Sequence, residues 1–177
     1  MKRLNKLLLL SGLLAASVSV GAGTASGSLA VSATFGALGG ACTISVPTSL
    51  SFGTAIPTPI PAEGVTGNGA LQVSCDSTRQ FDIGLSYGAG AGATCAARRM
   101  TGGTKTLNYA LYTPTPDGTG HTNVIWDSFL KDCGGVYSST TVGATAKMIT
   151  VHGLIPTGQI PDLGVAYQDT IQATLNF

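Results

Sequence analysis

The clearest pattern in this chain of 177 residues lies in its last eleven, Tyr167-Gln168-Asp169-Thr170-Ile171-Gln172-Ala173-Thr174-Leu175-Asn176-Phe177. Alternate positions carry Tyr, Asp, Ile, Ala, Leu and Phe, and the positions between them carry Gln, Thr and Asn. A period of two is typical of a β-strand that buries one of its faces. We therefore predict that the chain ends in a long strand with its apolar face in the core.

The same period of two recurs in earlier segments of the chain, at 29–35, 71–75, 81–87, 107–111 and 149–151. Turn-forming residues separate these segments, and they include Pro57 to Pro61, Gly67-Asn68-Gly69, Gly88 to Gly92 and Gly102-Gly103. No stretch of a dozen residues has a helical apolar stripe. Many short strands at this spacing predict an all-β fold, an immunoglobulin-like antiparallel sandwich.

The composition excludes some classes of protein. Hydrophobic residues make up 44% of the chain and charged residues only 10%, against about 25% charged in an ordinary domain. No Asp, Glu, Lys or Arg occurs between Lys6 and Glu63. Clustered Lys and Arg give nucleic-acid binders their affinity, so we expect no nucleic-acid partner. Intrinsic disorder is also excluded, because disordered chains are poor in apolar residues and rich in charge.

The first 25 residues have the order of a secretory signal peptide. Lys2, Arg3 and Lys6 precede an apolar run that begins at Leu7, and small residues follow it. Cleavage is expected near residues 22–27, after Ala22 or Ala25, and the run is short for a membrane anchor. The prediction is an exported protein with an N-terminal strand and tether at 26–40 and one domain at 41–177.

All four cysteines, Cys42, Cys75, Cys95 and Cys133, lie in the exported part. Disulfides form in such oxidising compartments, and no pair has the C-x-x-C spacing of a zinc or redox motif. We predict two structural disulfides. Spacing alone leaves three possible pairings open.

Residues for catalysis are scarce. The two histidines, His121 and His152, are interpreted as loop or strand-end residues, and Glu63 is the sole glutamate. No nucleophile elbow or metal-binding motif is present in the sequence. We therefore expect no enzymatic activity, no cofactor and no metal; an exported hydrolase that uses Asp127 or His121 is the least favoured alternative.

Two other features receive structural interpretations. Arg98, Arg99 and Lys105 form the only basic cluster, which we interpret as a solvated hairpin end, although such a cluster can also contact an acidic partner or a glycan. Trp126, the only tryptophan, is interpreted as a core residue.

The segment Ser28 to Phe35 is unusual for a mature N-terminus. It is uncharged, it carries the alternating apolar residues Leu29, Val31, Ala33 and Phe35, and the Gly-rich segment 36–40 connects it to the domain. An exposed apolar strand is an aggregation hazard. It can pair within its own sheet, or it can add to the open sheet edge of a neighbouring copy by strand addition.

Several motifs resemble the spore coat protein U domain family, which includes pilins of the archaic chaperone-usher pathway. They are Cys42-Thr43-Ile44, Leu50-Ser51-Phe52-Gly53, Val73-Ser74-Cys75, Arg98-Arg99-Met100, Leu107 to Tyr112, Ile155-Pro156, and the ending with Tyr167-Gln168-Asp169-Thr170 and Leu175-Asn176-Phe177. The resemblance covers essentially the whole mature chain.

The resemblance implies a pilin domain that lacks its final strand. A periplasmic chaperone would fill the gap, an outer-membrane usher would catalyse exchange, and the donor strand of the next subunit, through Leu29, Val31, Ala33 and Phe35, would replace the chaperone. The acceptor groove edge would carry Tyr167, Ile171, Ala173, Leu175 and Phe177, with the Phe177 carboxylate as a chaperone anchoring point. The resemblance also implies that Cys42 pairs with Cys75, which leaves Cys95 for Cys133.

The function implied is that of a structural subunit of a surface pilus, in a homo- or hetero-polymer, that supports adhesion or biofilm formation. Its location would be the cell surface, reached through the periplasm. Shaft and adaptor subunits are not distinguished. The alternative from another class is a free-standing secreted β-sandwich module that binds a glycan or a cell surface, with its N-terminal strand folded into its own sheet.

Overall fold

The computed structural model describes residues 24–33, 42–54, 56–141 and 143–177, and these contain ten strands and no helix. The strands are β1 (Thr24–Ala33), β2 (Cys42–Ser51), β3 (Val65–Cys75), β4 (Gln80–Leu85), β5 (Arg98–Gly102), β6 (Lys105–Pro114), β7 (His121–Ile125), β8 (Tyr137–Thr140), β9 (Lys147–Ile155) and β10 (Ala166–Asn176). No helix long and apolar enough to cross a bilayer is found in the described ranges. The predicted signal peptide lies outside them.

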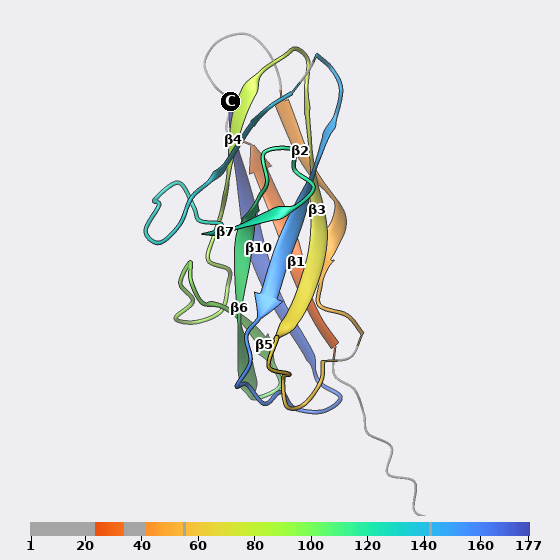
Figure 1. Cartoon of the computed structure of the whole chain (residues 1–177), viewed down its shortest axis with the longest axis vertical. Helices are drawn as coiled ribbons and strands as arrows, with labels where there is room; N and C mark the ends of the chain where they lie inside the picture. The colour runs from red at the N-terminus through yellow and green to blue at the C-terminus, as the bar shows by residue number, and fades with distance from the viewer. Residues whose placement is uncertain (1–23, 34–41, 55, 142) are drawn as a thin grey trace, which may run out of the picture.

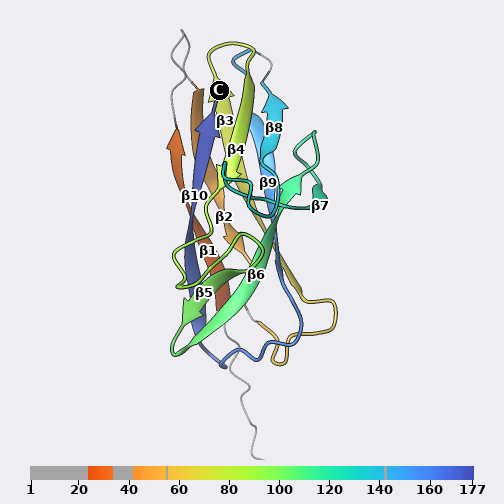
Figure 2. The same ribbon diagram turned by 90° about the vertical axis from the view of Figure 1, so that its left-hand side faces the viewer.

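The strands form a sandwich whose long axis follows the strand direction (Figure 1). One layer contains β2, β3, β9 and β6, with β7 beside β6, and the other contains β1, β10, β4 and β8. Seen from the side, β1 and β10 lie toward one edge of the molecule, and β9 and β7 toward the other (Figure 2). All pairings between these strands are antiparallel except that of β1 with β10. The all-β, immunoglobulin-like prediction is confirmed.

Two strands connect the layers at opposite sides. β5 pairs with β6 over its whole length and touches β10 through Gln168 and Thr101. β1 runs along the other edge of β10 and reaches β2 at the pairs Ser26 with Ser51 and Gly27 with Leu50. The hydrogen-bonded order therefore closes on itself, from β1 through β2, β3, β9, β6, β5 and β10 back to β1.

The core lies between the layers and follows the predicted alternation. In β10, buried and exposed residues alternate from Tyr167 to Leu175. The opposite layer contributes fully buried side chains from β3, β6 and β9, among them Leu71, Leu111 and Ile149. The C-terminal strand therefore supplies one wall of the core and has sheet partners on both of its edges.

The predicted turn at Gly67-Asn68-Gly69 is wrong, because these residues lie inside β3. Their glycines serve close packing instead. A Cβ on Gly67 would lie 2.6 Å from the Phe52 ring, and one on Gly69 would lie 2.8 Å from the backbone nitrogen of Leu50. The end of β2 and the Phe52 ring therefore pack directly against the backbone of β3.

Gly153 of β9 provides a test of this packing. A Cβ there would lie 2.7 Å from Phe52 Cζ and 3.4 Å from Leu111 Cδ2. Overpacking of this kind costs about 1–3 kcal/mol, so we expect Gly153→Ala to lower the free energy of unfolding by that amount in urea denaturation. The penalty should shrink in a Phe52→Leu background. Gly135→Ala is the matched control, because its Cβ would meet only Val124 at 3.5 Å; equal losses at both glycines would contradict this packing.

Candidate strand-acceptor site

The N-terminal strand lies along the C-terminal strand in a continuous register. Ten Cα pairs run from Thr24 with Ala166 to Ala33 with Leu175, and the two strands are parallel. The sequence left open whether this segment pairs within its own sheet or with a neighbour; in this single chain it pairs within its own sheet. The strand begins four residues before the predicted Ser28.

The predicted donor and acceptor positions stand opposite one another in this register. Leu29 is paired with Ile171, Val31 with Ala173, and Ala33 with Leu175. These acceptor residues of β10 are buried, with exposed fractions of 1% or less. The positions between them pair with outward residues, as Ala30 does with the exposed Gln172. The register thus places the apolar positions of β1 at the core-facing positions of β10.

Three further predicted site residues are Phe35, Phe177 and Tyr167. Phe35 lies outside the described residues. Phe177 follows β10 directly, is half-buried and packs against the core, and the Arg79 guanidinium carbon lies 5.8 Å from the centre of its ring. Tyr167, at the other end of β10, is fully buried, and its hydroxyl accepts a hydrogen bond from the Asp162 backbone N–H at 2.8 Å.

The second wall of the site is β2. It pairs with β3 along its length, with register shifts between Ser45 and Ser51, but with β1 only at Ser26 and Gly27. The Cys42–Cys75 disulfide joins the first residue of β2 to the last residue of β3. The site is therefore the gap between β10 and β2, one strand wide, and β1 fills it.

A buried polar cluster supports the wall formed by β10. Asp169 accepts hydrogen bonds from the Tyr109 hydroxyl at 2.7 Å and from the Ala89 backbone N–H at 2.8 Å. Burial and this bond to the carboxylate raise the pKa of Tyr109 well above its usual range, so the phenol stays protonated and keeps donating. Gly88 is required beside the carboxylate, because a Cβ there would overlap Asp169. Asp169 thus ties β10 to β6 and to the loop after β4.

The interpretation of the basic cluster as a solvated hairpin end is wrong for Arg98, which is fully buried. Its guanidinium donates to four backbone carbonyl oxygens: Ser86 at 3.0 Å, Cys95 at 3.0 Å, Leu85 at 3.4 Å and Trp126 at 2.6 Å. Burial lowers the pKa of this guanidinium, and the nearby Tyr109, Asp127 and Asp169 oppose that effect. A planar group with five donors suits such convergent carbonyls. The sequence could not indicate these hydrogen bonds, because the four carbonyl oxygens come from three separate segments of the chain.

The other two members of the basic cluster lie nearer the surface. Arg99 is half-buried and donates to the Ala91 carbonyl oxygen at 2.9 Å. Lys105 is exposed and forms an ion pair with Asp162 at 2.6 Å. The hydrogen bond to the Asp162 carboxylate raises the pKa of Lys105, and desolvation opposes part of this rise.

The second disulfide, Cys95–Cys133, lies beside the Arg98 cluster. The prediction of two disulfides is confirmed: Cys42 pairs with Cys75, as the family resemblance implied, and Cys95 pairs with Cys133, the two cysteines that then remained. Asp127 lies close to these sulfurs, but they are bonded to each other and its carboxylate accepts backbone N–H groups of Ser128, Cys133 and Gly134. Burial alone would raise the pKa of Asp127, and these hydrogen bonds bring it below its usual range. The arrangement stabilises a loop and leaves no thiolate for a metal.

Of the remaining sequence interpretations, that of Trp126 is confirmed and that of His152 is wrong. Trp126 is a core residue as predicted, fully buried, and its indole N–H donates to the Ile83 carbonyl oxygen at 2.8 Å. His121 is the first residue of β7, whereas His152 lies within β9 rather than at a strand end. The structure brings these two histidines together, although they lie 31 positions apart in the sequence.

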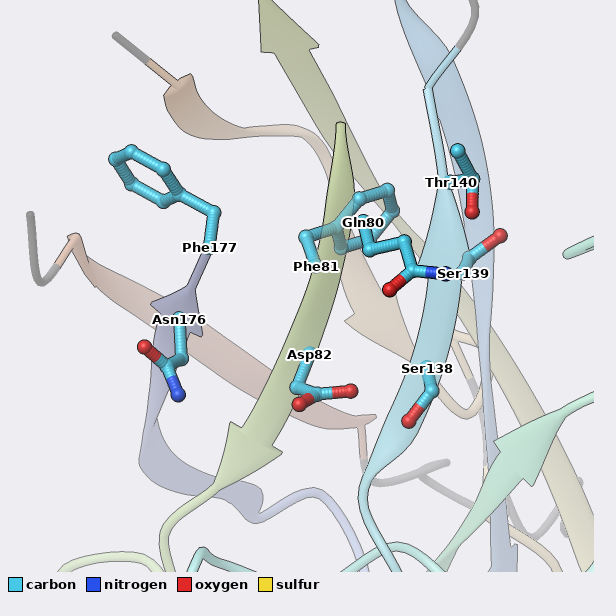
Figure 3. Close-up of a pocket in the computed structure, with 8 residues that line it drawn as sticks. All are labelled: Gln80, Phe81, Asp82, Ser138, Ser139, Thr140, Asn176 and Phe177. Atoms are coloured by element: carbon cyan, nitrogen blue, oxygen red, sulfur yellow. The ribbon is translucent and has the colours of Figure 1, made fainter. Parts of the chain in front are cut away.

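A polar recess of about 650 Å³ lies at the end of the acceptor strand, on the side of β10 away from β1. Figure 3 shows Asn176 and Phe177 at the end of β10, Asp82 on β4, and Ser138 and Ser139 on β8 around it. β8 ends the order of paired strands. The recess therefore borders both the chain terminus and a sheet edge.

The described residues thus define a β-sandwich in which the N-terminal strand β1 fills a gap one strand wide between β10 and β2. The chain is a member of the spore coat protein U domain family, whose model matches residues 17–174. No curated protein sequence matches the chain.

Among solved structures, the chain is similar to one in the crystal structure of the "CsuC-CsuE chaperone-tip adhesion subunit pre-assembly complex from archaic chaperone-usher Csu pili of Acinetobacter baumannii". The sequence identity is 15% and the TM-score 0.51, over 78% of this chain. The match spans 40% of that relative's chain. At this identity the likeness concerns the fold.

Arg98 offers a direct test of the buried cluster. Arg98→Lys keeps the charge but cannot reach four carbonyl oxygens at once. Because a buried charge without its full set of partners is costly, we expect a loss of about 3–5 kcal/mol in the free energy of unfolding, measured by denaturant titration with the disulfides intact. Arg99→Lys is the matched control and should cost less than about 1 kcal/mol. Similar losses at the two positions would contradict the role assigned to Arg98.

Proposed function

We propose that the protein is a structural subunit of a surface pilus, assembled by exchange of N-terminal strands between subunits. The observation that carries the proposal is the register of β1 on β10, which places Leu29, Val31 and Ala33 opposite the buried Ile171, Ala173 and Leu175. Membership of the spore coat protein U domain family supports it. In a fibre, the strand in this gap would come from a neighbouring copy.

The energetics of the gap favour this role. Without β1, the facing edge of β10 loses its ladder partners over ten residues. Such an edge invites pairing with another chain. Burial of all four donor side chains, Leu29, Val31, Ala33 and Phe35, would be worth about 5–9 kcal/mol before entropy, a large part of a typical stability of about 5–15 kcal/mol. A subunit whose gap is empty would therefore need a chaperone.

The proposed partners follow from this need. A periplasmic chaperone would supply a strand to the gap between β10 and β2, and an outer-membrane usher would catalyse its replacement by the next subunit's strand. The similar solved structure contains a chaperone-subunit pre-assembly complex of an archaic chaperone-usher system, which supports such partners here. The recess beside Phe177 lies at the chain terminus, where a chaperone contact is expected.

The protein would be exported through the periplasm to the cell surface and would act structurally rather than catalytically. A role in adhesion or biofilm formation would follow from its place in a pilus.

One observation favours a second candidate, a free-standing secreted β-sandwich module that binds a glycan or a cell surface. β1 pairs within its own chain, so the single chain closes its own gap. A purified, chaperone-free protein that stays monomeric at high concentration and does not exchange its strand with added peptide would favour this candidate.

Strand exchange can be tested with a chain that lacks Ser28 to Phe35. We expect this chain to bind its chaperone but to form no SDS-resistant multimers, because it has no strand to donate. A synthetic peptide of residues 24–35 should bind it and raise its melting temperature. SDS-resistant multimers of the truncated chain would refute the proposal.

Two matched peptides make the test specific to register. Ala33→Asp puts a carboxylate opposite the buried Leu175, whereas Ala30→Asp makes the same change opposite the exposed Gln172. Because burial of an unpaired charge is costly, we expect Ala33→Asp to weaken binding at least tenfold more than Ala30→Asp, as measured by fluorescence anisotropy. Equal effects would show that the peptide does not bind in the register of β1.

A further inference from the structure

The two histidines of the chain meet on the outer surface of the sandwich. His121 comes from β7 and His152 from β9, and their ring centres are 4.7 Å apart with the planes inclined by 45°. The Tyr112 ring centre lies 6.0 Å from that of His121. Tyr112 and Asn68 are the direct cross-strand partners of His152, on β6 and β3 respectively. Asn68 on β3, His152 on β9 and Tyr112 on β6 therefore form a row across three strands, and the His121 ring lies beside this row.

These side chains line a recess of about 320 Å³. Its polar lining comes from Thr66, Asn68, Tyr112, His121, Asn123 and His152. None of the described residues that line it is Asp, Glu, Lys or Arg. Hard cations such as Ca²⁺ and Mg²⁺ bind through carboxylate oxygens, so this lining does not suit them. Imidazole suits Zn²⁺, Cu²⁺ and Ni²⁺.

One imidazole nitrogen in the recess has no partner. His152 Nε2 is hidden from solvent and makes no hydrogen bond, which is a costly state for a buried polar atom. The backbone of Thr119 and Gly120 also interacts with this imidazole. Metal-binding histidines commonly direct one ring nitrogen to a backbone carbonyl and keep the other for the ion.

We propose that His121 and His152 form a site for one first-row transition-metal ion of the Cu²⁺, Ni²⁺ or Zn²⁺ class. A metal–nitrogen distance of about 2.0–2.1 Å puts each ring centre about 3.1–3.2 Å from the ion. If one nitrogen of each ring binds the ion, the observed 4.7 Å between ring centres gives an N–metal–N angle of about 95–100°, between square and tetrahedral values. Water and the Asn68, Asn123 or Tyr112 oxygens can complete the coordination.

This site is separate from the strand-acceptor site. It lies on the outer face of β3, β9 and β6, in the layer opposite β1 and β10 (Figure 1). Its occupancy is therefore independent of which chain supplies the strand in the gap, and failure of either proposal leaves the other standing.

The test uses the mature protein without a histidine tag and with its disulfides intact. Calorimetric titration with Cu²⁺, Ni²⁺ and Zn²⁺ should show one ion bound with a Kd of about 100 µM or tighter for at least one of them, and no binding of Ca²⁺ or Mg²⁺. His121→Gln and His152→Gln should each weaken that binding at least tenfold, and the double variant should abolish it. With Cu²⁺, the electron paramagnetic resonance spectrum should show coupling to nitrogen.

Met148→Gln is the control variant, because Met148 is exposed on the same strand as His152; it should bind like the unchanged protein. Circular dichroism and thermal unfolding of every variant exclude loss of the fold as the cause of weaker binding. Absence of binding for all three ions, or binding that persists in the His121→Gln/His152→Gln double variant, would overturn the proposal.

Discussion

The structure depends on the hydrogen bonds along both edges of β10. Its inward residues, from Tyr167 to Leu175, form one wall of the core. On one edge it pairs with β4 and β5, and on the other it pairs with β1 over ten residues. The first set of partners comes from the body of the domain. The second comes from a segment outside it, so the closure of the sandwich rests on a strand that is joined to the domain only by residues 34–41.

A rigid wall is needed if such a gap is to accept a strand in a single register. The Asp169 carboxylate, the Tyr109 hydroxyl and the buried Arg98 guanidinium hold β10, β6 and the loop after β4 together through directed hydrogen bonds. The Cys95–Cys133 disulfide joins the segment before β5 to the loop before β8. Apolar packing alone tolerates small shifts, whereas these polar contacts have fixed geometry. The polar cluster therefore fixes the position of the wall formed by β10.

Features with local sequence signals could be predicted. The alternation from Tyr167 to Phe177 indicated the last strand and its buried face, and the alternation at Leu29, Val31 and Ala33 indicated a strand of the same kind. The features that were missed arise from chain segments far apart in the sequence. Gly67 and Gly69 had the composition of a turn, but the approach of Phe52 and Leu50 decides their place in β3. Arg98 was interpreted as solvated because its partners are backbone carbonyl oxygens, which every residue has and which therefore leave no trace in the amino-acid sequence. The meeting of His121 and His152 required the pairing order of β7, β6 and β9.

The tether between β1 and β2 has a quantitative consequence. Residues 34–41 are a short connection, and a segment held by a short linker has an effective concentration in the millimolar range at its binding site. Any strand that arrives from solution competes against that local concentration. A free subunit is thereby protected from chance pairing with other copies. The same protection would oppose assembly into a polymer. A factor that keeps the chain's own strand out of the gap until the next subunit arrives would allow the neighbour's strand to bind, even if that strand forms no stronger contacts.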